Sequence, residues 1–356
     1  MISAVYYSNI YYLIVTIMTL VMVGYRKSLY SRENVGISIL LCISLILFIG
    51  FRPHSAIFGD TINYAKWWGM SNWHGWTWRT ENKIFDNIYG FMEGRFSDAT
   101  EFFVLISIIY FVGILVACRK LFPANTLMTF VIYLSAFSTY SYSVNGIKAG
   151  AATALFLVAL AYRDKMIISI IFLLLSWGFH HSMLLPVVAY ILTLIFKNKN
   201  WYFYGWCFCL LMAAAHITTF QTFFAGFSNE GVADYLIGGG NDNILHAKGG
   251  FRVDFIIYSV IPIIMAYYVK YKYKMKNRLY DVLLNMYLTC NGAWMLCMYA
   301  EFTNRIAYLS WFMYPILLIY PCYTIDNANH PLVKIRKKVV LGHLAFTLFM
   351  NIIYYG

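Results

Sequence analysis

Charged residues are scarce in this sequence. They make up 12% of its 356 residues, while the hydrophobic content is 61% and the mean hydropathy is +0.63; soluble domains carry about 25% charged residues. The chain has no basic segment before its first apolar run, so we expect that run to be a retained membrane helix and not a signal peptide. None of the seven cysteines lies in a long polar loop, and we therefore expect no disulfide framework.

Long apolar runs separated by short polar breaks fill the chain. At about 20 apolar residues per membrane span, they predict an all-α polytopic membrane protein with about 12 transmembrane helices, within a range of roughly 10 to 12. Residues 1–356 would form a single integral membrane domain. We expect the spans at residues 4–24, 35–51, 102–117, 125–143, 147–162, 166–180, 182–196, 201–219, 254–269, 279–300, 306–323 and 339–354.

Basic residues gather in every second polar break. That set of breaks holds 18 of the 27 Lys and Arg residues and 4 of the 15 acidic residues. Because cytoplasmic loops of membrane proteins carry an excess of Lys and Arg, we assign this set to the cytoplasm and both termini to the opposite side. The basic residues are spread over many short breaks, so nucleic acid is not an expected partner.

Two long loops, at about residues 52–101 and 220–253, then lie outside the cytoplasm. The first is rich in tryptophan, which predicts a short helix lying in the membrane interface. The second contains Gly238 to Gly240, a turn-rich stretch that could serve as a lid.

Polar residues cluster where predicted spans end on that outer side. Arg52 and Asp60 follow the second span, and Asn145 and Lys148 flank a tight turn between the fourth and fifth spans. The arginine either extends to lipid phosphates or clamps an anion with its planar fork. Asp60 either caps a helix or serves as a base. Lys148 begins a helix, where a cation opposes the helix dipole, so it either extends to the interface or helps that helix end to hold an anion.

A pair of histidines stands at the outer junction of the sixth and seventh spans. His180 and His181 are followed by Ser182. A lone interfacial histidine is most often a packing residue, but two adjacent imidazoles offer a base that titrates near neutral pH. A metal site is not expected, because neighbouring histidines on a helix point about 100° apart and no further ligands are evident.

The last outer turn carries Glu301, Asn304, Arg305 and Tyr308. Glu301 and Arg305 are four residues apart and would pair if they were helical. Arg252, at the end of the second long loop, stands close to Asp254 and has the same two interpretations, an ion pair or an anion clamp. A ring of basic residues with a base at one membrane face suits a lipid-linked diphosphate that arrives from the bilayer.

These residues resemble the EpsG/Wzy family of bacterial polysaccharide polymerases. The family pattern runs Phe-Arg, Gly-Asp-Thr-x-x-Tyr, Asn-Gly-Ile-Arg, Phe-His-x-Ser and Asn-Arg-Ile-Ala-Tyr. Here it is matched in order by Phe51-Arg52, Gly59 to Tyr64, Asn145 to Lys148, Phe179 to Ser182 and Asn304 to Tyr308. Lys148 stands where the family has arginine, and a lysine ammonium cannot make the two parallel hydrogen bonds that a guanidinium makes to an anion. The resemblance implies a GT-C-like architecture.

The resemblance also implies a function. The protein would be a glycosyltransferase of the bacterial inner membrane, with its active site facing the periplasm. It would polymerise undecaprenyl diphosphate-linked repeat units of an O-antigen, capsule or exopolysaccharide. A flippase and a chain-length regulator would be partners, and no metal or cofactor is expected. Arg52, Lys148, Arg252 and Arg305 would bind the diphosphate. His180 is the first choice for the base and Asp60 the second; the supporting residues would be Asn145, His181, Ser182, Glu301, Asn304 and Tyr308.

Other functions need a similar cationic site. A flippase for the same lipid-linked glycan would carry its charges at mid-membrane, within reach of both sides. An O-acyltransferase would need its histidine near a cytoplasmic donor. A ligase that moves finished glycan onto another lipid shares nearly all of the polymerase chemistry, and the sequence separates it poorly from a polymerase.

Overall fold

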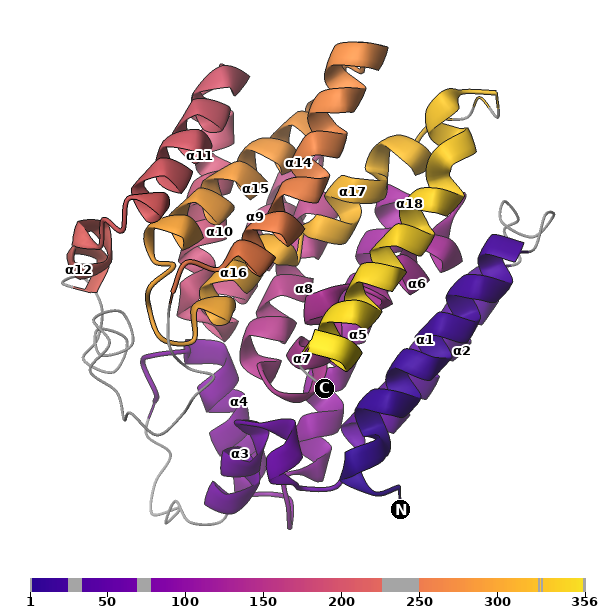
Figure 1. Cartoon of the computed structure of the whole chain (residues 1–356). Helices are drawn as coiled ribbons and strands as arrows, with labels where there is room; N and C mark the ends of the chain where they lie inside the picture. The colour runs from indigo at the N-terminus through magenta and orange to yellow at the C-terminus, as the bar shows by residue number, and fades with distance from the viewer. Residues whose placement is uncertain are drawn as a thin grey trace. The chain divides into compact units, whose positions relative to one another are not determined.

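The computed structural model describes residues 2–24, 34–68, 78–225, 250–325, 327 and 329–354, and over these residues every regular element is helical (Figure 1). Four helical segments are long and apolar enough to cross a membrane: Ala4–Gly24, Thr100–Leu121, Val253–Tyr273 and Thr303–Tyr323. Shorter apolar helices cover Val35–Gly50, Ile147–Ala161, Met166–Phe179 and His181–Ile195. The chain is therefore an all-helical polytopic membrane protein, and the number of about 12 spans stays a prediction.

The helices form two compact units. Unit 1 comprises Met1–Met183 and Pro321–Gly356, and unit 2 comprises Leu184–Tyr320. That residues 1–356 form a single integral membrane domain stays a prediction.

The helix α8 lies in the core of unit 1. Its helices are α1 (Tyr7–Gly24), α2 (Asn34–Gly50), α3 (Thr61–Trp67), α4 (Lys83–Glu93), α5 (Thr100–Leu121), α6 (Thr126–Leu134), α7 (Phe137–Val144), α8 (Ile147–Ala161), α9 (Met166–Phe179) and α18 (Pro331–Leu348), with short helices η1 (Ala4–Tyr6), η3 (Ala56–Phe58), η4 (His181–Met183) and η5 (Phe349–Tyr354). α8 is rich in alanine and buries almost every residue, as expected of a helix that is apolar on all sides. A Cβ atom at Gly113 of α5 would lie 3.0 Å from that of Ala154, so small residues allow α5 and α8 to pack closely.

Unit 2 contains a buried polar network. Its helices are α10 (Leu184–Ile195), α11 (Lys199–Ala214), α12 (Thr219–Ala225), α14 (Val253–Tyr273), α15 (Arg278–Leu296), α16 (Thr303–Trp311) and the first part of α17 (Tyr314–Tyr323). Asn291 on α15 donates to the hydroxyls of Ser259 (2.9 Å) and Ser310 (3.1 Å) and accepts from the indole of Trp206 (2.9 Å). Because these buried groups are hydrogen-bonded to one another, they hold α11, α14, α15 and α16 in register.

Two predicted spans are interrupted. The span predicted at residues 125–143 is wrong as one helix, because it breaks between α6 and α7 at Ser135 and Ala136. At the break, the carbonyl of Tyr133 accepts the backbone N–H of Ala136 (3.1 Å) and the hydroxyl of Thr139 (2.7 Å). The span predicted at 306–323 likewise breaks between α16 and α17, where Pro315 cannot donate to the carbonyl of Trp311.

The C-terminal helix begins earlier than predicted. The predicted span starts at residue 339, whereas α18 starts at Pro331, after His330 caps the helix by accepting from the backbone N–H of Leu332 (3.3 Å). The basic residues Lys334 to Lys338 therefore lie on helix, not in a break.

The first long loop is largely structured. It forms α3 and α4 where one interfacial helix was predicted, and Trp68 packs against Tyr89 with ring centroids 5.2 Å apart. Trp73 and Trp76, and the predicted lid at Gly238 to Gly240, lie outside the described residues.

Candidate active site

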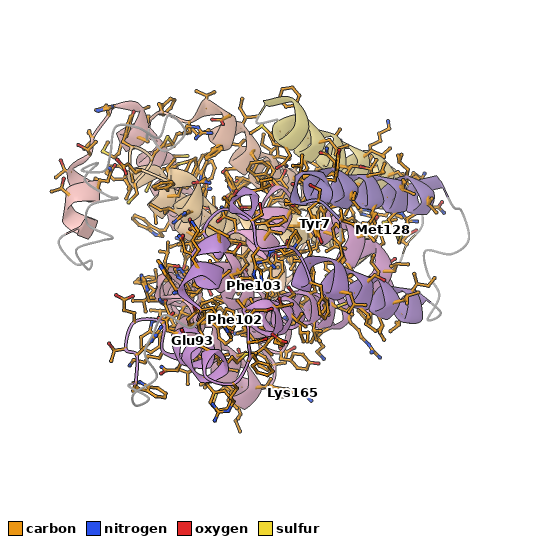
Figure 2. The ribbon with its side chains drawn as sticks, turned by 90° about the horizontal axis from the view of Figure 1, so that it is seen from below. Tyr7, Glu93, Phe102, Phe103, Met128 and Lys165 are labelled. Carbon is orange, nitrogen blue, oxygen red and sulfur yellow. The ribbon has the colours of Figure 1, made fainter. Side chains whose placement is uncertain are left out.

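α4 carries the polar residues on which the candidate site is built. It buries Phe85, Tyr89 and Met92, which share one helical face. The rings of Phe85 and Tyr89 each lie 5.2 Å from that of Phe102, at the start of α5. Figure 2 looks at the molecule from below, the side on which Figure 1 shows α3 and α4, and labels Phe102, Phe103 and Glu93 there. This packing fixes the start of α4, where Asn82 is the N-cap residue and Asp86 lies in the first turn.

Two of the sequence motifs meet at Gly59 and Asn145. The side-chain oxygen of Asn145 accepts the backbone N–H of Asp60 (2.9 Å). Gly59 has a φ angle of +64°, and a Cβ there would lie 2.4 Å from that same oxygen. Glycine is therefore required at position 59 for both its backbone conformation and its close approach to Asn145. Asp60 stands at the N-cap of α3, but its side chain makes no capping hydrogen bond, contrary to the capping alternative.

Lys148 forms an ion pair with α4. Its Nζ lies 2.9 Å from Oδ1 of Asp86 and 4.9 Å from the centre of the Phe85 ring. The carboxylate offsets the unfavourable position of a cation at the start of α8. The ammonium thus points to Asp86.

Asn82 fixes the proton on the ring of His181. Its Oδ1 accepts the backbone N–H of His181 (3.1 Å), so this atom is the acceptor, and it also lies 3.1 Å from Nδ1 of the same residue. Nδ1 must then carry the ring proton, which leaves the lone pair on Nε2. The backbone N–H and the Nδ2 of Asn82 donate to Oδ2 of Asp86 (3.1 and 3.4 Å), so one carboxylate holds both Asn82 and Lys148.

His180 has the opposite arrangement. Its Nδ1 accepts the backbone N–H of Ser182 (3.1 Å) and lies 2.5 Å from the Ser182 hydroxyl. A backbone N–H can only donate, so Nδ1 holds the lone pair and the ring proton of neutral His180 is on Nε2. The rings of His180 and His181 are stacked, with centroids 5.1 Å apart.

His181 stays neutral near pH 7. It lies in the connection between α9 and α10, where burial of its ring lowers its pKa below the usual range of about 6.5. Lys148 also lowers this pKa, while Glu81 and Asp86 raise it. A neutral imidazole is the form that accepts a proton.

Arg52 is a buried cation. It is 3% exposed, just after α2, with its guanidinium 4.4 Å from the centre of the Phe103 ring. Burial lowers its pKa to about 10, so it remains protonated at neutral pH. Nη1 donates to the carbonyl of Ile49 (2.8 Å), but within the described part of the chain Nη2 meets no acceptor. Extension to lipid phosphates does not describe so buried a side chain.

The remaining site residues predicted from the sequence belong to unit 2. Arg252 forms a two-pronged ion pair with Asp254 (2.9 and 2.5 Å). Glu301 precedes α16, which begins at Thr303, so the helical spacing that would pair it with Arg305 is not formed. Arg305 is exposed, with its guanidinium 4.7 Å from the Phe302 ring. On the same helix, Asn304 is half-buried and Tyr308 is buried.

Within the described residues, no group of three or more His, Cys, Asp or Glu side chains could hold a metal ion. The site instead consists of hydrogen bonds and one ion pair. In unit 1 they join Asn82 and Asp86 to Lys148 and to His181.

Sequence reasoning missed Asn82 and Asp86. Both lie in the loop that was interpreted as interfacial, and their partners are 99 and 62 residues away along the chain. The signal available was the spacing of Phe85, Tyr89 and Met92, which predicts a helix with one apolar face and an acidic first turn.

Comparison with known proteins gives one match. The family model described as the EpsG family matches residues 36–355, nearly the whole chain. No curated protein and no solved structure matches.

Proposed function

The chain belongs to the EpsG family, whose members are polysaccharide polymerase-like, and from this premise we propose that it is a Wzy-type polymerase of the bacterial inner membrane. It joins oligosaccharide repeat units that are linked to undecaprenyl diphosphate, on the periplasmic face. The observation that carries the proposal is the hydrogen-bonded arrangement of Asn82, Asp86, Lys148 and His181. It holds a neutral base and a cation from two of the motifs that resemble the family pattern.

The proposed reaction transfers the growing glycan. A sugar hydroxyl of the incoming unit attacks the anomeric carbon of the glycan and forms the new glycosidic bond. The bond between that carbon and the diphosphate oxygen breaks, and undecaprenyl diphosphate leaves with the electron pair. The base takes the hydroxyl proton. Since a diphosphate is already a good leaving group, the site needs counter-charge and a base more than it needs a general acid.

Arg52 is the first candidate for the counter-charge. Among the described residues, one end of its buried guanidinium meets no acceptor, which is costly, and an anionic oxygen would satisfy it with a strong, charge-assisted bond. Lys148 contributes less net charge, because Asp86 already neutralises it. Arg252 and Arg305 belong to unit 2, and their proposed role in binding the diphosphate rests on the sequence motifs alone.

The histidine pair supplies the base. Sequence reasoning favours His180, with Asp60 second, but the hydrogen bonds support His181. Its Nε2 keeps a lone pair, whereas the lone pair of His180 is covered by two donors from Ser182. His180 would accept a proton only through the Ser182 hydroxyl. We therefore assign the proton transfer to His181 and keep His180 as the rival assignment.

The glycan ladder of a deletion strain tests the proposal against its two rivals. A polymerase deletion leaves a single repeat unit on the final acceptor. Complete chains that are not attached to their acceptor would instead identify a ligase, and the loss of outward-facing lipid-linked units would identify a flippase.

A further inference from the structure

A cavity in unit 1 shares Asp86 and Lys148 with the hydrogen-bonded site. It has a volume of about 450 Å³ and lies at α3, α4 and the segment that precedes α4. Its aromatic lining is Tyr64, Trp67, Trp78 and Tyr89. The volume falls within the range of about 300–1,000 Å³ that is typical of small-molecule sites.

The walls of this cavity are held in place. The side chain of Asn87 accepts the backbone N–H of Arg79 (3.1 Å) and donates to its carbonyl (2.9 Å), which fastens the segment before α4 to the helix itself. On the other side, the hydroxyl of Tyr89 donates to the carbonyl of Tyr64 (2.8 Å) and ties α3 to α4. These hydrogen bonds connect the segments that form the walls of the cavity.

The charges in the lining cancel. Arg79 and Lys148 are balanced by Glu81 and Asp86, and Lys148 is paired with Asp86 at 2.9 Å. Such a lining gives no net attraction to a diphosphate, but it offers charged donors and acceptors to hydroxyl groups. Trp67 and Trp78 are 56% and 58% exposed, so they present wide apolar surfaces outside the membrane helices.

Aromatic faces beside balanced polar groups match the chemistry of an uncharged sugar. A pyranose ring has apolar C–H faces that stack on an aromatic ring and a rim of hydroxyls that hydrogen-bond to charged side chains. We propose that this cavity is the subsite for the terminal sugar of the acceptor, an inference that rests on the proposed glycosyl transfer.

The link to the base identifies the sugar as the acceptor. Asp86 forms part of the cavity wall and also holds Asn82, which orients His181. A sugar bound here lies against Asp86, which is connected to His181 through Asn82. The donor sugar instead requires the anion-binding residues at its diphosphate.

Direct binding tests the subsite. The probe is the free repeat-unit oligosaccharide, released from its lipid by mild acid, and the observable is saturation transfer from the full-length protein in nanodiscs to the sugar protons. We expect the wild type to bind the probe. Trp67→Ala and Trp78→Ala should each weaken binding at least tenfold, while Trp67→Tyr retains most of it. Trp201→Ala is the matched control, because Trp201 is 72% exposed on α11 of unit 2.

The outcomes separate this subsite from the proposed function. Unchanged binding in both alanine variants would overturn the subsite, and membrane anchoring would then explain the two tryptophans. The same conclusion follows if the wild type elongates lipid-linked units but binds no free sugar. A protein that binds the sugar through Trp67 and Trp78 but never elongates keeps the sugar site and refutes the polymerase.

Discussion

Replacing Asn82 with leucine tests how much the orientation of His181 contributes to the rate, with the base itself still present. The substitution removes the acceptor that keeps the ring proton of His181 on Nδ1 (3.1 Å). One such hydrogen bond is worth about 0.5–1.5 kcal/mol net, which corresponds to a change of roughly 2- to 13-fold in the ratio of the two tautomers. The turnover rate should therefore fall by at most about that factor, because the reactive tautomer is depleted and not abolished.

Loss of the base itself is a larger effect. His181→Gln should lower the rate by about 10²–10⁴-fold, the usual contribution of general base catalysis. The assay is elongation of purified lipid-linked repeat unit by protein in nanodiscs, with the amount of folded protein matched between variants.

Asn82→Asp provides the conservative control. It keeps an oxygen for Nδ1–H, and its negative charge stabilises the imidazolium, so it raises the pKa of His181. A base must be neutral, and activity is therefore lost as the pH falls through this pKa. The acid limb of the pH profile should move to higher pH in Asn82→Asp. A rate for Asn82→Leu that equals the wild type, or a loss as large as that of His181→Gln, would refute the tautomer argument.

Four further results are expected. His180→Gln should retain more elongation activity than His181→Gln when both are measured at the same protein level; the reverse order would return the base to His180 and Ser182. Arg52→Ala and Arg305→Ala should each abolish polymer in cells without loss of protein from the membrane. Arg52→Lys should rescue little, because an ammonium does not reproduce the bidentate hydrogen bonds of a guanidinium. Full-length polymer in both alanine variants would contradict the proposal that these arginines bind the diphosphate. Gly59→Ala should lower stability by about 1–3 kcal/mol, since alanine at a φ of +64° is strained and meets Asn145, and a melting temperature like that of the wild type would contradict this. Reporter fusions should be exported at Arg79 and cytoplasmic at Lys274; the opposite pattern would reverse the topology.

Most of the helices could be predicted, because a membrane helix requires a long apolar run in the sequence. The breaks within the predicted spans could not be predicted. Ser135 and Thr139 lie in a stretch rich in Ser and Thr, and their hydroxyls donate to backbone carbonyls at the break. Ser and Thr also make such hydrogen bonds inside continuous membrane helices, so their presence did not mark the break.

The candidate site was predictable in its motifs but not in its connections. Asn145, Lys148 and the histidine pair stand out because polar residues at the ends of apolar runs are costly. Which histidine is the base depends on Asn82, which is brought to His181 by the packing of α4 on Phe102 and is ordinary in sequence. For Arg52 the sequence left extension to lipid phosphates and an anion clamp open, and its burial against Phe103 emerges only from the fold.

Elongation by the purified protein tests the central claim most directly. The protein in nanodiscs is given undecaprenyl diphosphate-linked repeat units, with no flippase, nucleotide sugar or chain-length regulator, and the products are separated by length while undecaprenyl diphosphate is quantified. The polymerase account predicts a ladder of products, with one undecaprenyl diphosphate released for each bond formed. Repeat units that remain single, with no undecaprenyl diphosphate released, would contradict it.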